Sequence, residues 1–298
     1  MVRNSLDSNS CGAKERFRRI KLFKPTLRRV VEDSFIWHPL MSDDTRIHEL
    51  FKVQLKDPVL IQGLPGLGYV GKVAVDYFIE KLKPKKFAEL YSSYLLFPDG
   101  NLGINISEDG TYSLPKYEFY AFGDREPNAI LLTGDAQPSV TGQYEVASMV
   151  LDFAQQFGCK MVFTMGGYGT RSGNDVGAVY GVVGDAMIGD RLKKLGAKLA
   201  KGGAVTGAAG VILGIGRQRG LQCAGLLGAT SGVYPDLEAA RAVIQMLTGL
   251  VNVPVELKDL DSEIEDMRKK MEKVRRTDLE EPREGEEKPE EGKDRYIT

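Results

Sequence analysis

LIQGLPGLGYVGK, residues 60–72, joins a short apolar run to a helical pattern through four glycines. The run Pro58–Ile61 predicts a buried strand, and apolar positions from about Tyr69 to Leu82 recur at helical spacing until Pro84. A buried strand, a glycine turn and a helix are typical of α/β proteins with a parallel sheet. This stretch therefore sets the expected fold class, and it raises the question of whether the turn binds phosphate.

The turn is close to a P-loop. Gly66, Gly71 and Lys72 have the P-loop spacing, which would place backbone N–H groups and a lysine around phosphates. A P-loop also requires Ser or Thr after the lysine, because that hydroxyl holds Mg²⁺, and Val73 occupies this position. The sequence therefore disfavours a P-loop.

The turn also has the spacing of a dinucleotide-binding motif, through Gly66, Gly68 and Gly71. That motif requires an acidic residue at the end of the next strand, about 20 residues further on. Glu89 lies close to this distance, but its neighbours do not form a clear strand end, and Pro65 stiffens the turn. Two interpretations stay open: a phosphate site, or a turn whose glycines allow close packing.

Strand-like and helix-like segments alternate after this turn. The segment Phe87–Ala121 contains turn signals and is expected to form antiparallel hairpins. Residues 202–216 are rich in glycine and alanine and are expected to form a loop that leads into a helix. Buried strands are expected at 129–133, 161–165 and 221–227, helices at 140–157, 186–199 and 236–250, and exit loops at 134–138 and 166–169. We predict an α/β fold with a mostly parallel sheet flanked by helices, an antiparallel β-rich insertion or edge, and a C-terminal heptad helix.

The two ends of the chain differ from its middle. Residues 1–40 hold nine Lys/Arg and four Asp/Glu, whereas residues 277–294 hold three basic and nine acidic side chains. We expect a disordered basic extension over 1–46, or initiation at Met41, then an α/β core over 47–254, a heptad-patterned helix over 255–276 and a disordered acidic tail over 277–298.

The heptad stripe consists of Leu257, Leu260, Ile264, Met267, Met271 and Val274. It spans fewer than three heptads, which is short for an independent coiled coil. We expect it to pack either on its own domain or on a neighbouring subunit.

Composition excludes several classes of function. A formal net charge of -1 argues against a general nucleic-acid binder. No apolar run approaches the ~20 residues that span a bilayer, so no membrane association is expected. Cys11, Cys159 and Cys223 are widely spaced and form no zinc motif, which suits a reducing cytoplasm. We predict a cytoplasmic protein with no metal and no cofactor.

Catalytic residues are sparse. The two histidines, His38 and His48, precede the first predicted strand, which disfavours a Ser-His-Asp or Cys-His site. Asp135, Arg171 and Asp175 follow predicted strands, where α/β enzymes place their sites, although caps and surface residues also occur there. Cys159 and Cys223 are best explained as core residues.

The glycine turn also opens a longer series of motifs that resembles the proteasome assembly chaperone family, the archaeal and bacterial relatives of eukaryotic proteasome assembly chaperone 2. The similar segments follow in order from Gly63–Gly71 through Leu132–Pro138, Gly166–Gly169, Gly207–Gly210 with Leu213, Leu226–Gly228, and Tyr234–Asp236 with Ala239 and Ala240. The resemblance covers residues 57 to 275.

This resemblance implies a fold similar to purine nucleoside phosphorylases without a catalytic site. It implies an oligomer, of this chain alone or with a paralogue, that helps to assemble proteasome core particles. Archaeal members contact proteasome α-subunits through C-terminal tails with a penultimate tyrosine. Here Tyr296 is third from the end, so the implied docking peptide is Tyr296, Ile297 and Thr298.

Two hypotheses follow. The first is a non-catalytic assembly chaperone whose tail docks into pockets of the α-ring. The second is a nucleotide- or nucleoside-binding enzyme, an ATP-dependent ligase or a phosphorylase-like protein. That enzyme would hold phosphate at the Gly66–Gly71 turn, with Arg171 and Asp175 nearby.

Overall fold

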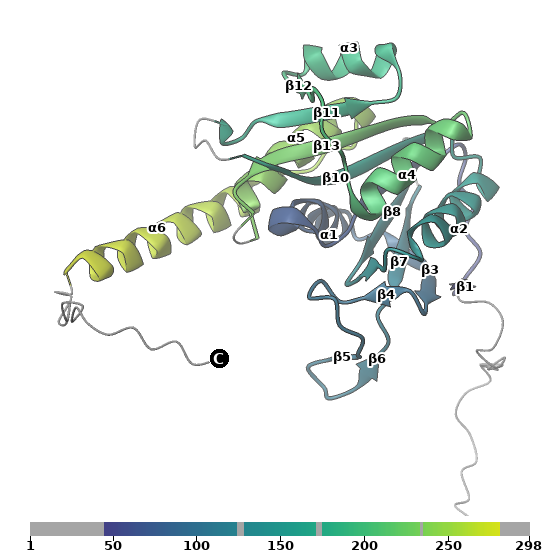
Figure 1. Ribbon diagram of the computed structural model, residues 1–298, viewed down its shortest axis with the longest axis horizontal. Coiled ribbons are helices and arrows are strands. Elements are labelled where there is room, and N and C mark those ends of the chain that lie inside the picture. Colours follow the sequence, from purple (N-terminus) through teal and green to yellow (C-terminus); the bar gives the residue numbers. More distant parts are fainter. Residues whose placement is uncertain (1–44, 124–127, 171–174, 233–234, 281–298) are drawn as a thin grey trace, which may run out of the picture. The chain divides into compact units, whose positions relative to one another are not determined.

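A nine-stranded sheet organises the part of the chain that the structure, a computed structural model, describes: residues 45–123, 128–170, 175–232 and 235–280, without the side chains of Met271 and 273–280. All of these residues fall within one compact unit, 41–298. In spatial order the strands are β1 (Thr45–Glu49), β3 (Lys85–Ser92), β7 (Tyr117–Phe122), β8 (Ala129–Gly134), β2 (Val59–Gly63), β10 (Met161–Gly169), β13 (Gln222–Thr230), β11 (Val179–Val183) and β12 (Lys198–Leu199) (Figure 1).

The centre of the sheet is parallel. β2 lies between β8 and β10, with Val59 opposite Ala129 on one side and Met161 on the other, and β13 continues the parallel set beyond β10. These strands are the continuous apolar runs of the sequence, as expected for strands covered on both faces. The predicted α/β fold with a central parallel sheet is confirmed.

The flanks of the sheet are antiparallel. β3 and β7, predicted as hairpin strands, pair with each other, and β7 also pairs with β8, so this region extends the main sheet. On the other flank β11 runs antiparallel to β13. The sequence did not reveal β11, because glycines surround and interrupt its short apolar run.

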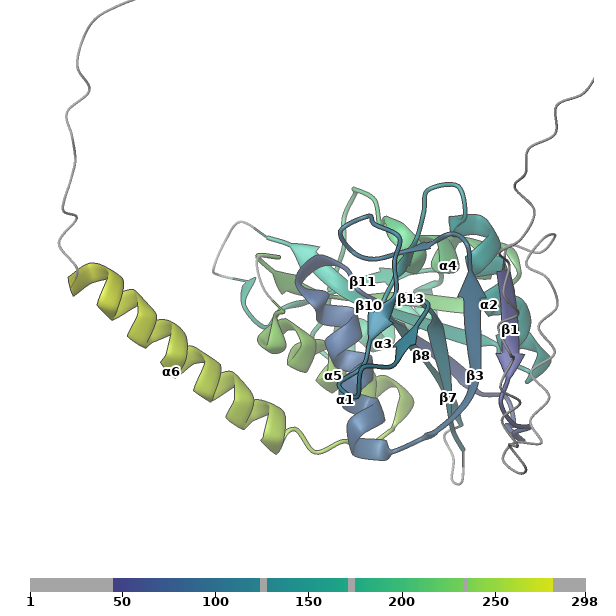
Figure 2. The same ribbon diagram turned by 90° about the horizontal axis from the view of Figure 1, so that it is seen from below.

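Helices cover the two faces of the sheet (Figures 1 and 2). One face carries α1 (Val70–Leu82), α3 (Ala186–Lys194), α5 (Leu237–Val251) and the start of α6 (Lys258–Glu280). The other carries α2 (Gln143–Gln156) and α4 (Gly207–Gln218). Each layer buries an apolar cluster against the sheet, which gives the domain two cores.

Three sequence-based boundaries were wrong. The predicted exit loop 166–169 is the end of β10, because Gly166–Gly169 pair in register with Leu227–Thr230 of β13. The expected helix 186–199 ends at Lys194, and Lys198–Leu199 form β12. Most of the predicted loop 202–216 belongs to α4, which begins at Gly207. In the first and third cases glycines were taken as loop signals, although here they belong to a strand and a helix. In the second case the helical pattern was extended past Gly196, whose φ of 92° is a left-handed conformation that ends the helix.

Two glycines of the opening stretch bring α1 against the sheet. A Cβ atom on Gly71 would lie 2.1 Å from the carbonyl oxygen of Met165 in β10, and one on Gly63 would lie 2.0 Å from the carbonyl oxygen of Gly71. Neither contact tolerates a side chain, since backbone rather than a movable side chain blocks the space. The helix axis is therefore held at a distance that only glycine permits.

The first half of α6 packs on its own domain. Leu260 and Ile264 are buried in the cluster under α1 and α5, and Lys81 of α1 forms a 2.7 Å ion pair with Asp259. The hydroxyl of Tyr77 donates to the Glu256 carbonyl at 2.6 Å, just before the helix. Of the two partners expected for the heptad stripe, its own domain is thus observed for the first turns.

We predict that Gly71→Ala lowers the free energy of unfolding by ~1–3 kcal/mol or more, because ~1–3 kcal/mol is the usual cost of overpacking. Urea denaturation measures this change. Gly66→Ala is the matched control, because a Cβ there meets only the Leu64 carbonyl oxygen at 3.9 Å. The control should change stability by less than ~0.5 kcal/mol. Equal losses in the two variants would contradict the packing role assigned to Gly71.

Candidate functional site

The glycine turn is folded against the ends of the central strands. Leu67–Tyr69 form a 3-10 turn, η1, in which Gly68 has a φ of 61°, a left-handed conformation that favours glycine. A Cβ on Gly68 would lie 2.6 Å from Thr230 Oγ1, and the Gly68 carbonyl accepts a 2.8 Å hydrogen bond from the Asp236 N–H. Gly68 therefore serves packing between η1, β13 and the start of α5.

The topology argues against the dinucleotide hypothesis. In that motif the acidic residue ends the parallel strand next to the glycine turn. Glu89 instead lies within the antiparallel strand β3, separated from β2 by β7 and β8. Its carboxylate accepts hydrogen bonds from Lys86 and Lys116 at 2.7 Å each. Glu89 is thus part of an ion-pair network rather than a ribose ligand.

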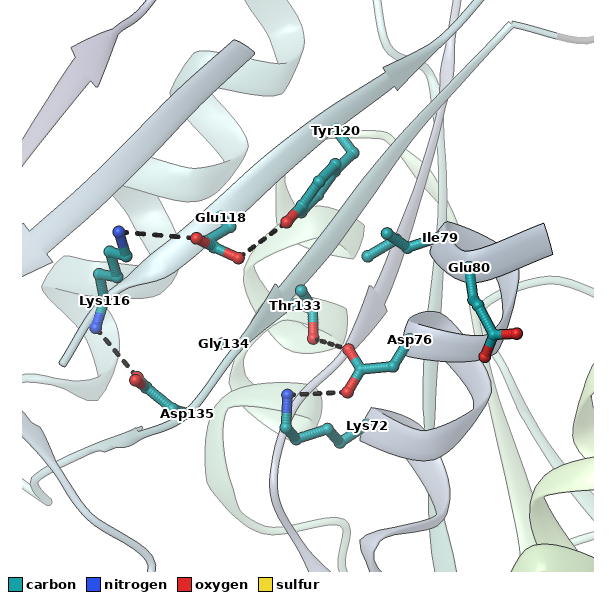
Figure 3. Close-up of a pocket in the computed structure, with 10 residues that line it drawn as sticks. All are labelled: Lys72, Asp76, Ile79, Glu80, Lys116, Glu118, Tyr120, Thr133, Gly134 and Asp135. Carbon is teal, nitrogen blue, oxygen red and sulfur yellow. Dashed lines mark hydrogen bonds and ion pairs between the residues drawn. The ribbon is translucent and has the colours of Figure 1, made fainter. Parts of the chain in front are cut away.

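A cavity of about 380 Å³ lies beside this network, between α1, β7 and β8. Its lining is shown in Figure 3 and consists of Lys72, Asp76, Ile79, Glu80, Lys116, Glu118, Tyr120, Thr133, Gly134 and Asp135. The helix contributes the first four of these residues, and the two strands with their ends contribute the rest. Because Gly63 and Gly71 fix α1, they also fix one wall of the cavity.

Most polar groups of the cavity are bound to one another. Asp76 pairs with Lys72 at 2.9 Å and accepts from the Thr133 hydroxyl at 2.7 Å. Glu118 accepts from the Tyr120 hydroxyl at 2.9 Å, and the dashed lines of Figure 3 show these pairs. A ligand would have to replace such bonds rather than find free donors, which limits the affinity that the cavity offers.

The charge of the cavity disfavours phosphate. Asp76, Glu80, Glu118 and Asp135 contribute carboxylates, whereas the lysines are Lys72 and Lys116, and Lys116 is also bound to Glu89 at 2.7 Å. Two lysines against four carboxylates leave a net negative lining at neutral pH. A nucleotide phosphate would be repelled there, since like charges at short range raise the free energy of binding.

The neighbouring face of β3 and β7 holds the network on Glu89. The Tyr91 hydroxyl donates to Glu89 at 2.8 Å, in addition to Lys86 and Lys116. Burial raises the pKa of the Glu89 carboxyl, but the hydrogen bonds from Lys116, Lys86 and Tyr91 outweigh it and hold that pKa at about 2. Burial also raises the pKa of Glu118, and hydrogen bonds from Lys86 and Tyr120 reverse this, so the net change is downward. Both carboxylates are therefore ionised at neutral pH.

Sequence reasoning did not identify this network, although a signal was present. On β3 the residues are Lys86, Glu89 and Tyr91. Glu118 and Tyr120 lie on β7, and Lys116 directly precedes that strand. Their spacing is close to two, which places them on one face of the sheet. A β-bulge between Lys86 and Ala88 shifts the register by one and disguises the pattern on β3.

Among the loop residues that the sequence singled out, Asp135 lines the cavity and accepts a 3.0 Å hydrogen bond from the Lys116 N–H. Asp175 pairs with Lys198 at 2.8 Å, and this hydrogen bond lowers the pKa of the carboxyl. Arg171 lies outside the described residues. The structure thus gives Asp135 and Asp175 structural partners at separate places and does not bring them together as a site.

The remaining candidates have structural surroundings or lie outside the described part. His48 lies in β1 with its ring edge-on to Tyr91 at 5.7 Å. Cys159 and Cys223 are buried, and burial raises the pKa of the Cys223 thiol to about 11. The expected docking residues Tyr296, Ile297 and Thr298 fall outside the described residues.

In the described ranges, His, Cys, Asp and Glu side chains form no cluster of three or more suited to a metal ion, and no helix is long and apolar enough to cross a membrane.

The fold and the site define a class: an α/β domain with a parallel centre, antiparallel flanks, glycine-packed helices and a small acidic cavity. The model of the PAC2 family matches residues 60–275, and the chain belongs to this family. This match begins within β2 and ends within α6, so it includes all of the fold described above except β1, the first residue of β2 and the end of α6.

Known proteins of this fold include two from Pyrococcus furiosus. The crystal structure of PbaB, described as an archaeal proteasome activator, superposes with a TM-score of 0.71 at 33% identity over 78% of this chain and 99% of that one. PbaA, described as an archaeal homolog of proteasome-assembly chaperone, gives a TM-score of 0.61 at 25% identity over 78% and 95% of the two chains. Uncharacterized protein MJ1210 of Methanocaldococcus jannaschii is 31% identical over 70% of this chain and 79% of its own.

We predict that the Glu89 network makes stability depend on acid pH. The pKa of Glu89 is about 2 in the folded protein and about 4.5 in the unfolded chain. The contribution of Glu89 to the free energy of unfolding is therefore fully present above pH 4.5 and is lost as the pH falls toward 2. Glu89→Gln should lower the Tm at pH 7 and flatten its decline between these pH values, measured by calorimetry.

Glu263→Gln, at an exposed position of α6, is the control for this measurement and should keep the wild-type slope. If Glu89→Gln and wild type lose Tm in parallel from pH 5 downward, Glu89 does not carry the acid dependence.

Proposed function

We propose that this protein is a non-catalytic, cytoplasmic chaperone that promotes assembly of the proteasome core particle by binding α-subunits, with its C-terminal tail docking into pockets of the α-ring. The observation that carries the proposal is the similarity to PbaB and PbaA, whose descriptions are a proteasome activator and a proteasome-assembly chaperone homolog. Both similarities cover more than three quarters of this chain.

The arrangement of the described residues supports a binding protein over an enzyme. The glycine turn is occupied by packing contacts, and the cavity lining is acidic and paired within the protein. The alternative, a nucleotide- or nucleoside-binding enzyme at the Gly66–Gly71 turn, requires free backbone donors and positive charge at one place. Gly66 has space around it, but Gly68 and Gly71 are closed by Thr230 and Met165.

The docking step is assigned to Tyr296, Ile297 and Thr298. An aromatic side chain buried in a pocket and a carboxylate that pairs with a lysine are two strong, short-range contacts. The preceding residues 277–294 are rich in Glu, Pro and Gly, a composition that predicts a solvated tether. The tether would let the docking peptide reach a pocket while the folded domain contacts the α-subunits.

A homo-oligomer, alone or with a paralogue, would strengthen this docking. Several tails on one assembly bind one ring with an avidity above that of a single tail. Since the first turns of α6 are attached to α1 and α5, each tail would begin from a fixed point on its own domain. The proposal therefore separates a rigid domain, which sets the positions of the tails, from the peptides that bind.

We predict that deleting residues 295–298 weakens binding to isolated proteasome α-subunits by tenfold or more, about 1.4 kcal/mol, measured by pull-down and by biolayer interferometry. The loss should come from faster dissociation, because an anchor contact has been removed. A deletion variant that binds as tightly as the intact chain would contradict tail docking.

Deleting residues 284–287 is the matched control for this test. It removes the same number of residues from the acidic tether and keeps Tyr296, Ile297 and Thr298 at the end. This control should bind like the wild type, whereas Tyr296→Ala should show most of the loss.

A further inference from the structure

The hairpin of β5 (Asn105–Ile106) and β6 (Tyr112–Ser113) has an inverted pattern of exposure. Ile106 pairs with Tyr112 across the two strands, and each is 74% exposed. Asn105 and Ser113, the next pair, are only partly exposed, and the Asn105 side-chain amide donates to Asp135. The apolar pair thus faces solvent while the polar pair faces the domain, the reverse of an ordinary surface hairpin.

Local hydrogen bonds join the residues at the tip of the hairpin. At its tip the Asp109 carboxylate accepts from the Thr111 N–H at 3.0 Å and from its hydroxyl at 2.7 Å, and the Gly110 N–H donates to the Ser107 carbonyl at 2.9 Å. At its base the ring of Phe97 lies against Gly103. The exposed apolar side chains therefore lie on a hairpin with its own hydrogen bonds and a packing contact at its base.

Further exposed apolar side chains occur close by in the sequence. Leu102 and Ile104 precede β5, Leu114 follows β6, and they are 73%, 47% and 49% exposed. They continue the alternate positions of Ile106 and Tyr112, which places them on the same side where the chain is extended. At roughly 200 Å² for a fully exposed large side chain, the five residues expose on the order of 600 Å² of mainly apolar surface. That equals the upper end of the ~300–600 Å² of the largest apolar patch on a typical monomer, and patches of this size are often functional.

We propose that this hairpin is the contact surface for a second copy of the same chain, through a two-fold axis that packs the two apolar faces together. The area agrees with this partner, because a stable interface buries ~800 Å² on each side and the hairpin supplies most of it. The hairpin projects from the domain beyond β4 (Leu95–Leu96), which itself pairs with β9 (Gln137–Pro138) (Figure 1). A projection suits contact with an equal projection better than capture of a peptide in a groove.

Charge also favours a second copy. The apolar face contains no ionised side chain, so two identical faces do not repel each other, and homodimer interfaces are the most apolar class. The acidic residues of the hairpin, Glu108 and Asp109, lie at its tip. Under two-fold symmetry the hairpins can run antiparallel, which keeps the two acidic tips apart.

This inference deepens the proposed function, since it assigns a surface to the expected oligomer, but it makes no use of the tail. The test is sedimentation equilibrium of the full chain, from sub-micromolar to about 100 µM, with the double variant Ile106→Glu/Tyr112→Glu. We expect wild type to self-associate and the double variant to shift to a smaller species, with at least ~tenfold weaker association.

Met187→Glu is the matched control, because Met187 is 60% exposed and lies on α3, and it should associate like wild type. Circular dichroism and the Tm report whether the double variant folds. If it does not, Ile106→Cys in a Cys11→Ser background gives a second test: a short bis-maleimide should link two copies, whereas Met187→Cys should not.

A wild type that stays monomeric, a double variant that associates unchanged, or an Ile106→Cys chain that fails to cross-link would overturn the inference. Unchanged self-association with weaker α-subunit binding would assign the hairpin to the proteasome instead and would also overturn it. Failure of the proposed function looks different: the chain would self-associate through the hairpin but would not bind α-subunits.

Discussion

The close backbone contact between α1 and the central strands is the constraint on which the rest of the structure depends. Gly71 meets the Met165 carbonyl and Gly63 meets Gly71, so the helix lies nearer to the sheet than any side chain would permit. Because α1 is fixed, Tyr77 and Lys81 can bind the segment around the start of α6. The same helix supplies one wall of the acidic cavity. A turn that resembles a phosphate loop thus positions the helical layer.

The sequence predicted the fold well and its flanks less well. Continuous apolar runs identified β2, β8, β10 and β13 because both faces of these strands are buried, and that condition leaves a clear composition. β11 and the end of β10 were missed, because glycine in a sequence suggests a loop and the sequence does not show which segment packs against it. Gly167 is the clearest case: a Cβ there would lie 2.3 Å from the Leu67 carbonyl oxygen, a contact between segments distant in sequence.

The candidate site was less predictable for the same physical reason. Glu89 and Asp135 drew attention from sequence, but as possible ribose or catalytic groups. Their shared partner Lys116 comes from a different segment of the chain, 27 residues from Glu89 and 19 from Asp135. Family membership could be inferred early, because it rests on an ordered series of glycine motifs that the PAC2 family match confirms. Turn signals predicted the hairpin itself, but not the exposure of its apolar pair, because strand alternation does not say which face meets water.

The most direct test of whether the glycine turn packs or binds is calorimetric titration of the full chain with Mg-ATP. A turn whose glycines serve helix packing, beside an acidic cavity, should give no saturable heat at micromolar concentrations of the protein. Gly66→Asp, at the turn position with free space, should leave the titration unchanged. Saturable micromolar binding that Gly66→Asp abolishes would contradict this and would return the turn to the nucleotide-binding class.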